Sequence, residues 1–201
     1  MSEFPFPRLP YLSPALSASA PWVLWLIGLG VMTVATTESL FRDVPPDVAA
    51  IGTFATYVTA ATVALLLVGF MFLFALSCSL MLSWLQESLR PAMVTRAVSL
   101  AFWAMTANAW IGAVLVLVDP PPSIDVDVLL LPSSDESAED MLGMPWLNEL
   151  RNVCSVIFAV ACFALLARSV RPLHALLAVL FASATVAFVT AAIGWVGDTG
   201  L

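Results

Sequence analysis

An apolar run over residues 49–85 constrains this chain more than any other stretch. It contains no Asp, Glu, Lys, Arg, His or Pro. A bilayer core about 30 Å thick is crossed by about 20 helical residues, and a helix over the whole run would be roughly 55 Å long. Two structures fit: one long helix over residues 49–86, or two short spans joined near Gly69. Because a turn at that depth would leave backbone groups without hydrogen bonds in lipid, we expect the single helix.

The composition of the chain is that of a membrane protein. Of its 201 residues, 61% are hydrophobic and 10% are charged, whereas soluble domains average about 45–50% and about 25%. We therefore expect an all-α polytopic membrane protein, in which a membrane domain over residues 21–197 follows a flexible N-terminal tail over residues 1–20. Its five transmembrane helices are predicted at about residues 21–41, 49–86, 92–118, 150–167 and 172–196.

The distribution of charge predicts the orientation of these helices. All seven basic residues are arginine, and five spans place their connections alternately on the two sides of the membrane. One side then holds Arg8 and four arginines that we treat as topology anchors, Arg90, Arg96, Arg168 and Arg171. Acidic residues concentrate in the loop over residues 119–149, on the other side. Because basic loops stay in the cytoplasm, we expect a cytoplasmic N-terminus, an external C-terminus and a bacterial inner (cytoplasmic) membrane.

Several residues are expected to define the ends of the helices. The turns at residues 88–91 and 169–172 read SLRP and SVRP. In each, arginine meets the free carbonyls of one helix end, and proline opens the next helix. We expect Trp22 and Trp25 to lie at the membrane interface and Asp47 to cap the long helix.

Few polar groups fall inside the predicted spans, and they are the candidate site residues: Glu38, Thr53, Thr56, Thr59, Thr62 and Asn108. We expect Glu38 to lie near the lipid headgroups; the alternative is an ion or proton site. The threonines recur every third residue, and we expect their hydroxyls to bond to carbonyls one turn earlier. Alternatively, they line a polar path. Asn108 is predicted to form an interhelical hydrogen bond, with substrate recognition as the alternative.

Small residues predict where the helices approach one another closely. Ala104, Asn108 and Gly112 step by four residues along one face of the third span. In the fifth span the corresponding stripe is Ser183, Ala187 and Ala191. Such stripes allow transmembrane helices to pack at short distance, so we expect both to contact other helices.

The sequence contains none of the common catalytic motifs. A Ser-His-Asp set, a zincin motif, a phosphate loop and a dinucleotide fingerprint are all missing. His174 is the only histidine, and we expect an interfacial rather than a catalytic side chain. The three cysteines are expected to act as small hydrophobic residues. We therefore predict a protein that is not an enzyme, with no cofactor and no metal, and the lack of a basic face argues against a nucleic-acid partner.

One arrangement of spans resembles a known family. A long apolar run leads into LQESLRPAMVTRAVSL at residues 85–100 and is followed by a span, an external loop and a final helical hairpin. This order resembles the Yip family of five-span membrane proteins over residues 49–195. The eukaryotic members bind Rab GTPases and carry an Asp-Leu-Tyr-Gly-Pro-type cytosolic motif. That motif is absent here, so the resemblance implies a topology and not a Rab partner.

These observations predict an accessory or scaffolding subunit of a larger membrane complex. Interfacial tryptophans and small-residue stripes are plentiful, whereas reactive side chains are scarce. The expected partners are membrane lipid and other membrane protein subunits. The alternative is a small transporter or lipid-handling protein that uses the threonines of residues 53–62, Asn108 and Glu38.

Overall fold

The long apolar run forms one helix in the computed structural model, which describes residues 14–87, 91–123 and 146–198. This helix, α2, is Pro46–Trp84 and has 39 residues. At about 1.5 Å per residue its length is roughly 58 Å, which exceeds the ~30 Å hydrocarbon core. Gly69 lies within α2, and the helix is not interrupted there. The prediction of a single long helix is confirmed.

The described residues form helices and no strand. Besides α2, the helices are α1 (Pro14–Leu40), α3 (Pro91–Ala101), α4 (Trp103–Val118), α7 (Trp146–Leu166) and α8 (Pro172–Asp198). Five spans are long and apolar enough to cross a membrane, and α3 and α4 together form one of them. The predictions of an all-α fold and of five candidate spans in an integral membrane protein are confirmed. Most of the predicted acidic loop, residues 124–145, lies outside the described residues.

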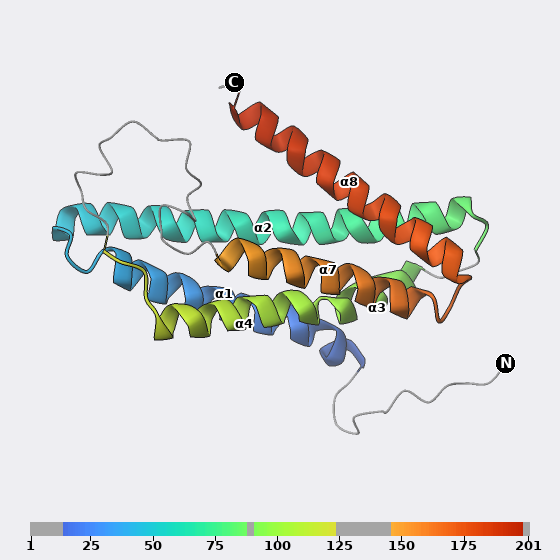
Figure 1. Ribbon diagram of the computed structural model, residues 1–201, viewed down its shortest axis with the longest axis horizontal. Helices are drawn as coiled ribbons and strands as arrows, with labels where there is room; N and C mark the ends of the chain where they lie inside the picture. Colours follow the sequence, from blue (N-terminus) through green and yellow to red (C-terminus); the bar gives the residue numbers. More distant parts are fainter. Residues whose placement is uncertain (1–13, 88–90, 124–145, 199–201) are drawn as a thin grey trace.

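The helices pack as two pairs that other contacts join (Figure 1). α1 lies along α4, and α2 packs against α8. α7 contacts α3, α4 and α8, so that it connects the two pairs. The core gathers the most deeply buried side chains of these elements, including Leu82, Phe102, Cys162 and Ala178. The last part of α8 runs away from the rest of the bundle.

Prolines mark the beginnings of the helices. Pro46, Pro91 and Pro172 each stand first in a helix, where a missing N–H costs no hydrogen bond. α1 begins at Pro14, so the prediction of an irregular tail through residue 20 is wrong for residues 14–20. The stretch contains three alanines, the best helix formers. The predicted cap is also wrong, because Pro45 occupies the N-cap position of α2 without a side-chain hydrogen bond and Asp47 lies in the first turn.

The third span contains a break that the sequence did not predict. α3 ends at Ala101 and α4 begins at Trp103, with Phe102 between them. The hydroxyl of Thr106 lies 3.2 Å from the carbonyl oxygen of Phe102 and 2.8 Å from that of Pro21 in α1. A threonine hydroxyl that bonds to a carbonyl one turn earlier commonly bends a helix. Thr56 and Thr62 make the same bond within the uninterrupted α2, so this bond alone does not account for the break.

The tryptophans of α1 lie partly in the core. The ring of Trp22 stacks on Phe102 with 3.9 Å between centroids, and Trp25 meets Phe102 edge-on at 5.7 Å. Trp25 is only 4% exposed, so its predicted place at the membrane interface is wrong. Aromatic pairs of this geometry are worth about 0.5–1.5 kcal/mol beyond the burial of area, and Phe102 provides a partner for both rings.

Candidate functional site

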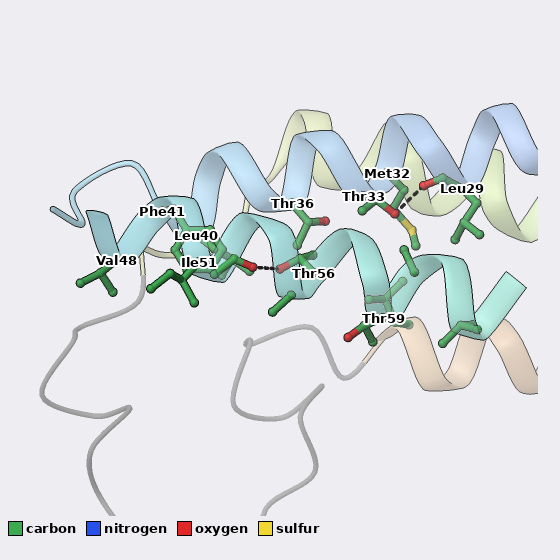
Figure 2. A pocket seen from close by; sticks show the side chains of 15 residues that line it. Leu29, Met32, Thr33, Thr36, Leu40, Phe41, Val48, Ile51, Thr56 and Thr59 are labelled. Atoms are coloured by element: carbon green, nitrogen blue, oxygen red, sulfur yellow. Dashed lines mark hydrogen bonds between the residues drawn. The ribbon is translucent and has the colours of Figure 1, made fainter. Parts of the chain in front are cut away.

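The candidate site is an apolar groove between α1 and α2, which we call the α1–α2 groove (Figure 2). Its volume is about 680 Å³. Most of its lining is aliphatic, and the hydroxyls of threonine are its polar groups. The lining residues are Leu29, Met32, Thr33, Thr36, Leu40, Phe41, Val48, Ile51, Gly52, Ala55, Thr56, Thr59, Ala60, Val63 and Leu147.

The four predicted threonines of α2 do not all reach this groove. Thr56 and Thr59 line it, whereas Thr53 and Thr62 do not. The hydroxyls of Thr56 and Thr62 donate to carbonyl oxygens one turn earlier, those of Gly52 and Val58, each at 2.9 Å. Back-bonding of this kind is what the sequence predicted for the stripe. A three-residue step also carries the stripe around the helix, so that its hydroxyls point in several directions.

Two threonines of α1 complete the polar part of the groove, and the sequence reasoning missed them. Thr33 and Thr36 line it from the side that faces α2. The hydroxyl of Thr33 donates to the carbonyl oxygen of Leu29 at 2.8 Å. Figure 2 shows Thr36 of α1 opposite Thr56 of α2. The cluster TVATT at residues 33–37 was the available signal, because it places three hydroxyls within about one turn of an apolar span.

Gly52 of α2 packs closely against the ring of Phe41, the residue that follows α1. A Cβ atom at this position would collide with the ring of Phe41. Phe41 also lines the groove, so its ring lies between the two helices. A larger residue at position 52 would therefore displace the Phe41 ring from its present position.

Glu38 and Asn108 lie outside the groove. Glu38 is exposed, two residues before the end of α1. The Oδ1 atom of Asn108 is buried, and it has no hydrogen-bond partner among the described residues. This oxygen therefore does not form the interhelical hydrogen bond that the sequence predicted for Asn108. Glu38, Asn108 and the threonines do not converge on one site.

Polar contacts between helices are made by other residues, mainly between α1 and the α3–α4 span. The indole nitrogen of Trp110 donates to the carbonyl oxygen of Leu24 at 3.0 Å. That of Trp22 donates to the hydroxyl of Ser99, also at 3.0 Å. Together with the hydrogen bond from Thr106 to Pro21, these contacts join α1 to the α3–α4 span through three hydrogen bonds. The spacing of small residues gives no sign of them, since their acceptors are mostly backbone carbonyls.

The residues next to the two arginine-containing turns lie close together, as the contact between Glu87 and His174 shows. Three topology anchors are described, and all three are exposed: Arg168 and Arg171 at the second turn, and Arg96 in α3. Arg90 lies outside the described residues. Nδ1 of His174, at the start of α8, lies 2.7 Å from a carboxylate oxygen of Glu87, just after α2. His174 thus joins the end of α2 to the start of α8.

Within the described ranges, no group of three or more His, Cys, Asp or Glu is placed to hold a metal ion. Cys78, Cys154 and Cys162 are buried and unpaired. Comparison of the chain with protein-family models, with curated proteins and with solved structures finds no match. The helices and grooves of the chain itself are the basis for inferring its function.

Proposed function

We propose that this chain is a non-catalytic accessory or scaffolding subunit of a larger membrane complex, and that a partner helix packs on the last part of α8. One observation carries the proposal. From Ala187 to Gly194, every residue except Val189 is exposed, and this part of α8 runs away from the bundle (Figure 1). Of the five spans, α8 also has the smallest buried share.

The residues of this exposed segment suit a helix–helix contact. Association of helices in lipid depends on close packing, which small side chains permit. The first part of α8 packs in this way within the chain, since Ala175, Ala178 and Ala182 are each 0% exposed. Farther along the helix, Ala187 and Ala191 are exposed, and nothing lies within 4 Å of a Cβ built on Gly194. The same chemistry is thus available to a second protein.

The absence of a catalytic centre is part of the proposal. Glu38 lies near the start of α2, whereas His174 lies beside the residues that follow its end. The length of α2, roughly 58 Å, separates the two. Acid–base catalysis needs groups within hydrogen-bond reach of the same substrate. This separation argues against a catalytic pair of Glu38 and His174. The carboxylate within reach of His174 is that of Glu87, and their contact joins two helix ends.

The proposed location is a bacterial inner membrane, with the arginine-containing turns in the cytoplasm. The exposed Arg168 and Arg171 support this orientation, because arginine near the ends of short loops holds those loops on the cytoplasmic side. The segment of α8 that we assign to a partner then lies toward the external side.

Photo-crosslinking tests the partner helix. A photoreactive amino acid at Ala191 is expected to yield a protein adduct in cells, and one at Leu65, an exposed position of α2, is expected to yield lipid adducts. Mass spectrometry after purification in mild detergent would identify the adducts. A chain that purifies alone, with lipid adducts at both positions, would contradict the proposal.

A lipid-handling function is the second candidate, and the α1–α2 groove favours it. Its volume of about 680 Å³ and its aliphatic lining suit an acyl chain. If this function is correct, Ala60→Phe should fill the groove and slow lipid transfer between vesicles. Glu38→Gln and Asn108→Leu, which lie outside the groove, serve as controls and should leave transfer unchanged. An undiminished rate in Ala60→Phe would exclude this role.

A further inference from the structure

A second groove lies between α1, α2 and α3, and we call it the α1–α2–α3 groove. Its volume is about 1010 Å³, larger than that of the α1–α2 groove. Its lining includes Val68, Phe72 and Leu76 of α2 and Thr95 and Arg96 of α3. It therefore combines an apolar wall with a cationic side chain.

Arg96 and the apolar wall of this groove lie at different levels along the axis of α2. α2 and α3 are consecutive and antiparallel, so Arg96, in the second turn of α3, lies toward the end of α2. Arg96 is exposed. The hydroxyl of Thr95 donates to the carbonyl oxygen of Pro91 at 3.1 Å, and that of Ser99 accepts from Trp22. The guanidinium group of Arg96 is the cationic group in the lining of the groove.

The length of the groove matches one leaflet of a bilayer. On α2 its lining extends from Ser79 to Val68, which is about 16 Å at ~1.5 Å per residue. Half of a hydrocarbon core of about 30 Å is about 15 Å. An acyl chain can thus follow the wall of α2 from the headgroup level to the middle of the membrane.

We propose that the α1–α2–α3 groove binds an anionic phospholipid of this leaflet. The phosphate lies at Arg96, whose planar guanidinium can donate two parallel hydrogen bonds to it. One acyl chain lies against Val68, Phe72 and Leu76. Charge complementarity selects an anionic lipid over a zwitterionic one, because the zwitterionic headgroup carries, besides the same phosphate, an ammonium group that the guanidinium repels. The site does not depend on the partner helix proposed for α8.

Lipid titration followed by native mass spectrometry tests the headgroup contact. The purified chain, stripped of lipid, would receive phosphatidylglycerol or phosphatidylcholine with identical acyl chains. We expect tighter binding of phosphatidylglycerol. Arg96→Gln should reduce this preference about five-fold, the factor that corresponds to about 1 kcal/mol per basic residue at an anionic surface. Arg96→Lys keeps the charge and should retain most of the preference.

Two further variants distinguish this site from general attraction to the membrane. Arg168→Gln removes an exposed arginine that does not line the groove, and it should leave the preference unchanged. Leu76→Trp narrows the apolar wall at an exposed position, and it should weaken the binding of both lipids. Equal losses in Arg96→Gln and Arg168→Gln, or unchanged binding in Leu76→Trp, would overturn the proposal.

Discussion

Gly28 and Gly30 lie two residues apart on α1, yet their surroundings differ. A Cβ atom at Gly28 would lie 3.2 Å from the indole ring of Trp110 and 3.3 Å from the Cβ of Ala109, whereas none would lie within 4 Å at Gly30. The Trp110 ring is held by its bond to Leu24, so it cannot simply move away. We expect Gly28→Ala to lower the free energy of unfolding by roughly 1–3 kcal/mol, the usual cost of overpacking.

Gly30→Ala is the matched control for that variant. Without a steric cost, alanine in a helix interior should stabilise the protein by about 0.5–1 kcal/mol. Thermal unfolding of both variants in the same detergent measures the difference. Equal unfolding temperatures would mean that α1 and α4 are farther apart than described.

Gln86 adopts a backbone conformation that usually belongs to glycine. Its φ is 59°, and the amides of Gln86 and Glu87 donate to the carbonyls of Ser83 and Leu82, each at 3.0 Å. This is the Schellman pattern of a helix end, in which the left-handed position favours glycine. We expect Gln86→Gly to stabilise the protein by about 1 kcal/mol and Gln86→Val to destabilise it. Chemical unfolding in detergent should show a higher free energy of unfolding for Gln86→Gly and a lower one for Gln86→Val. A gain in stability for Gln86→Val would contradict the left-handed conformation of this turn.

Individual residues were the hardest features to predict from the sequence. Trp25 was expected at the interface because tryptophan is common there, but it is buried in the core, where it meets Phe102 edge-on. Asn108 was expected to form an interhelical bond, yet Trp22, Thr106 and Trp110 make those contacts instead. A sequence shows which groups can donate a hydrogen bond. It does not show which carbonyl a neighbouring helix will present.

Among the helices, α8 offers the clearest test of how the spans associate. Ala178 is 0% exposed, and its carbonyl oxygen lies 3.6 Å from Sγ of Cys78 in α2. Leucine at this position would force α8 away from α2, so Ala178→Leu should destabilise the protein by at least 1–3 kcal/mol. Ala187→Leu, on the exposed part of the same helix, should leave the isolated chain unaffected.

Comparison of Ala178→Leu with Ala187→Leu also separates an effect on folding from an effect on partner binding. Unfolding temperature in detergent should fall for Ala178→Leu alone, because Ala178 is buried against α2 whereas Ala187 is exposed. If a partner packs on the exposed part of α8, Ala187→Leu should reduce the amount of co-purifying protein. Destabilisation of the isolated chain by Ala187→Leu would instead place this face inside the fold.

The elements themselves followed from the sequence more closely than their contacts did. Apolar runs predicted five spans, and Pro91 and Pro172 predicted two helix beginnings, whereas the start of α2 at Pro46 was not predicted. The packed face of α8 was not predicted: the stripe of Ser183, Ala187 and Ala191 is largely exposed, and Ala175, Ala178 and Ala182 are buried instead. In a helix that is apolar all round, hydrophobicity does not distinguish one face from another. The threonines of α2 were equally hard to assign to a face. Thr56 and Thr59 line the α1–α2 groove, whereas Thr53 and Thr62 do not.

The whole bundle combines two modes of association that lipid favours. The α1–α4 pair is held by hydrogen bonds from Trp110 and Thr106 to backbone carbonyls. The α2–α8 pair is held by close contact of alanines. Neither mode needs water to drive it, in contrast to a soluble core. Both leave apolar surface facing outward, and both grooves open onto that surface. The lipid and the partner helix that we propose would both bind to this outward-facing apolar surface.

The number of crossings decides the orientation of the whole molecule. Asp43 and Ser123 are exposed and are separated by two spans, so they should lie on the same side of the membrane. Ser169 is exposed and is separated from Asp43 by three spans, so it should lie on the opposite side. Because the described native cysteines are buried, a cysteine introduced at any of these positions should be the main site that a membrane-impermeant maleimide labels.

Labelling of intact cells gives the expected pattern directly. The maleimide should label Asp43→Cys and Ser123→Cys from outside, and it should reach Ser169→Cys only after the membrane is permeabilised. The reverse pattern would invert the orientation but keep the five spans. Asp43→Cys and Ser169→Cys on the same side would require an even number of crossings between them. In that case α2 would not cross the bilayer as one helix, because the other two spans alone return the chain to its starting side.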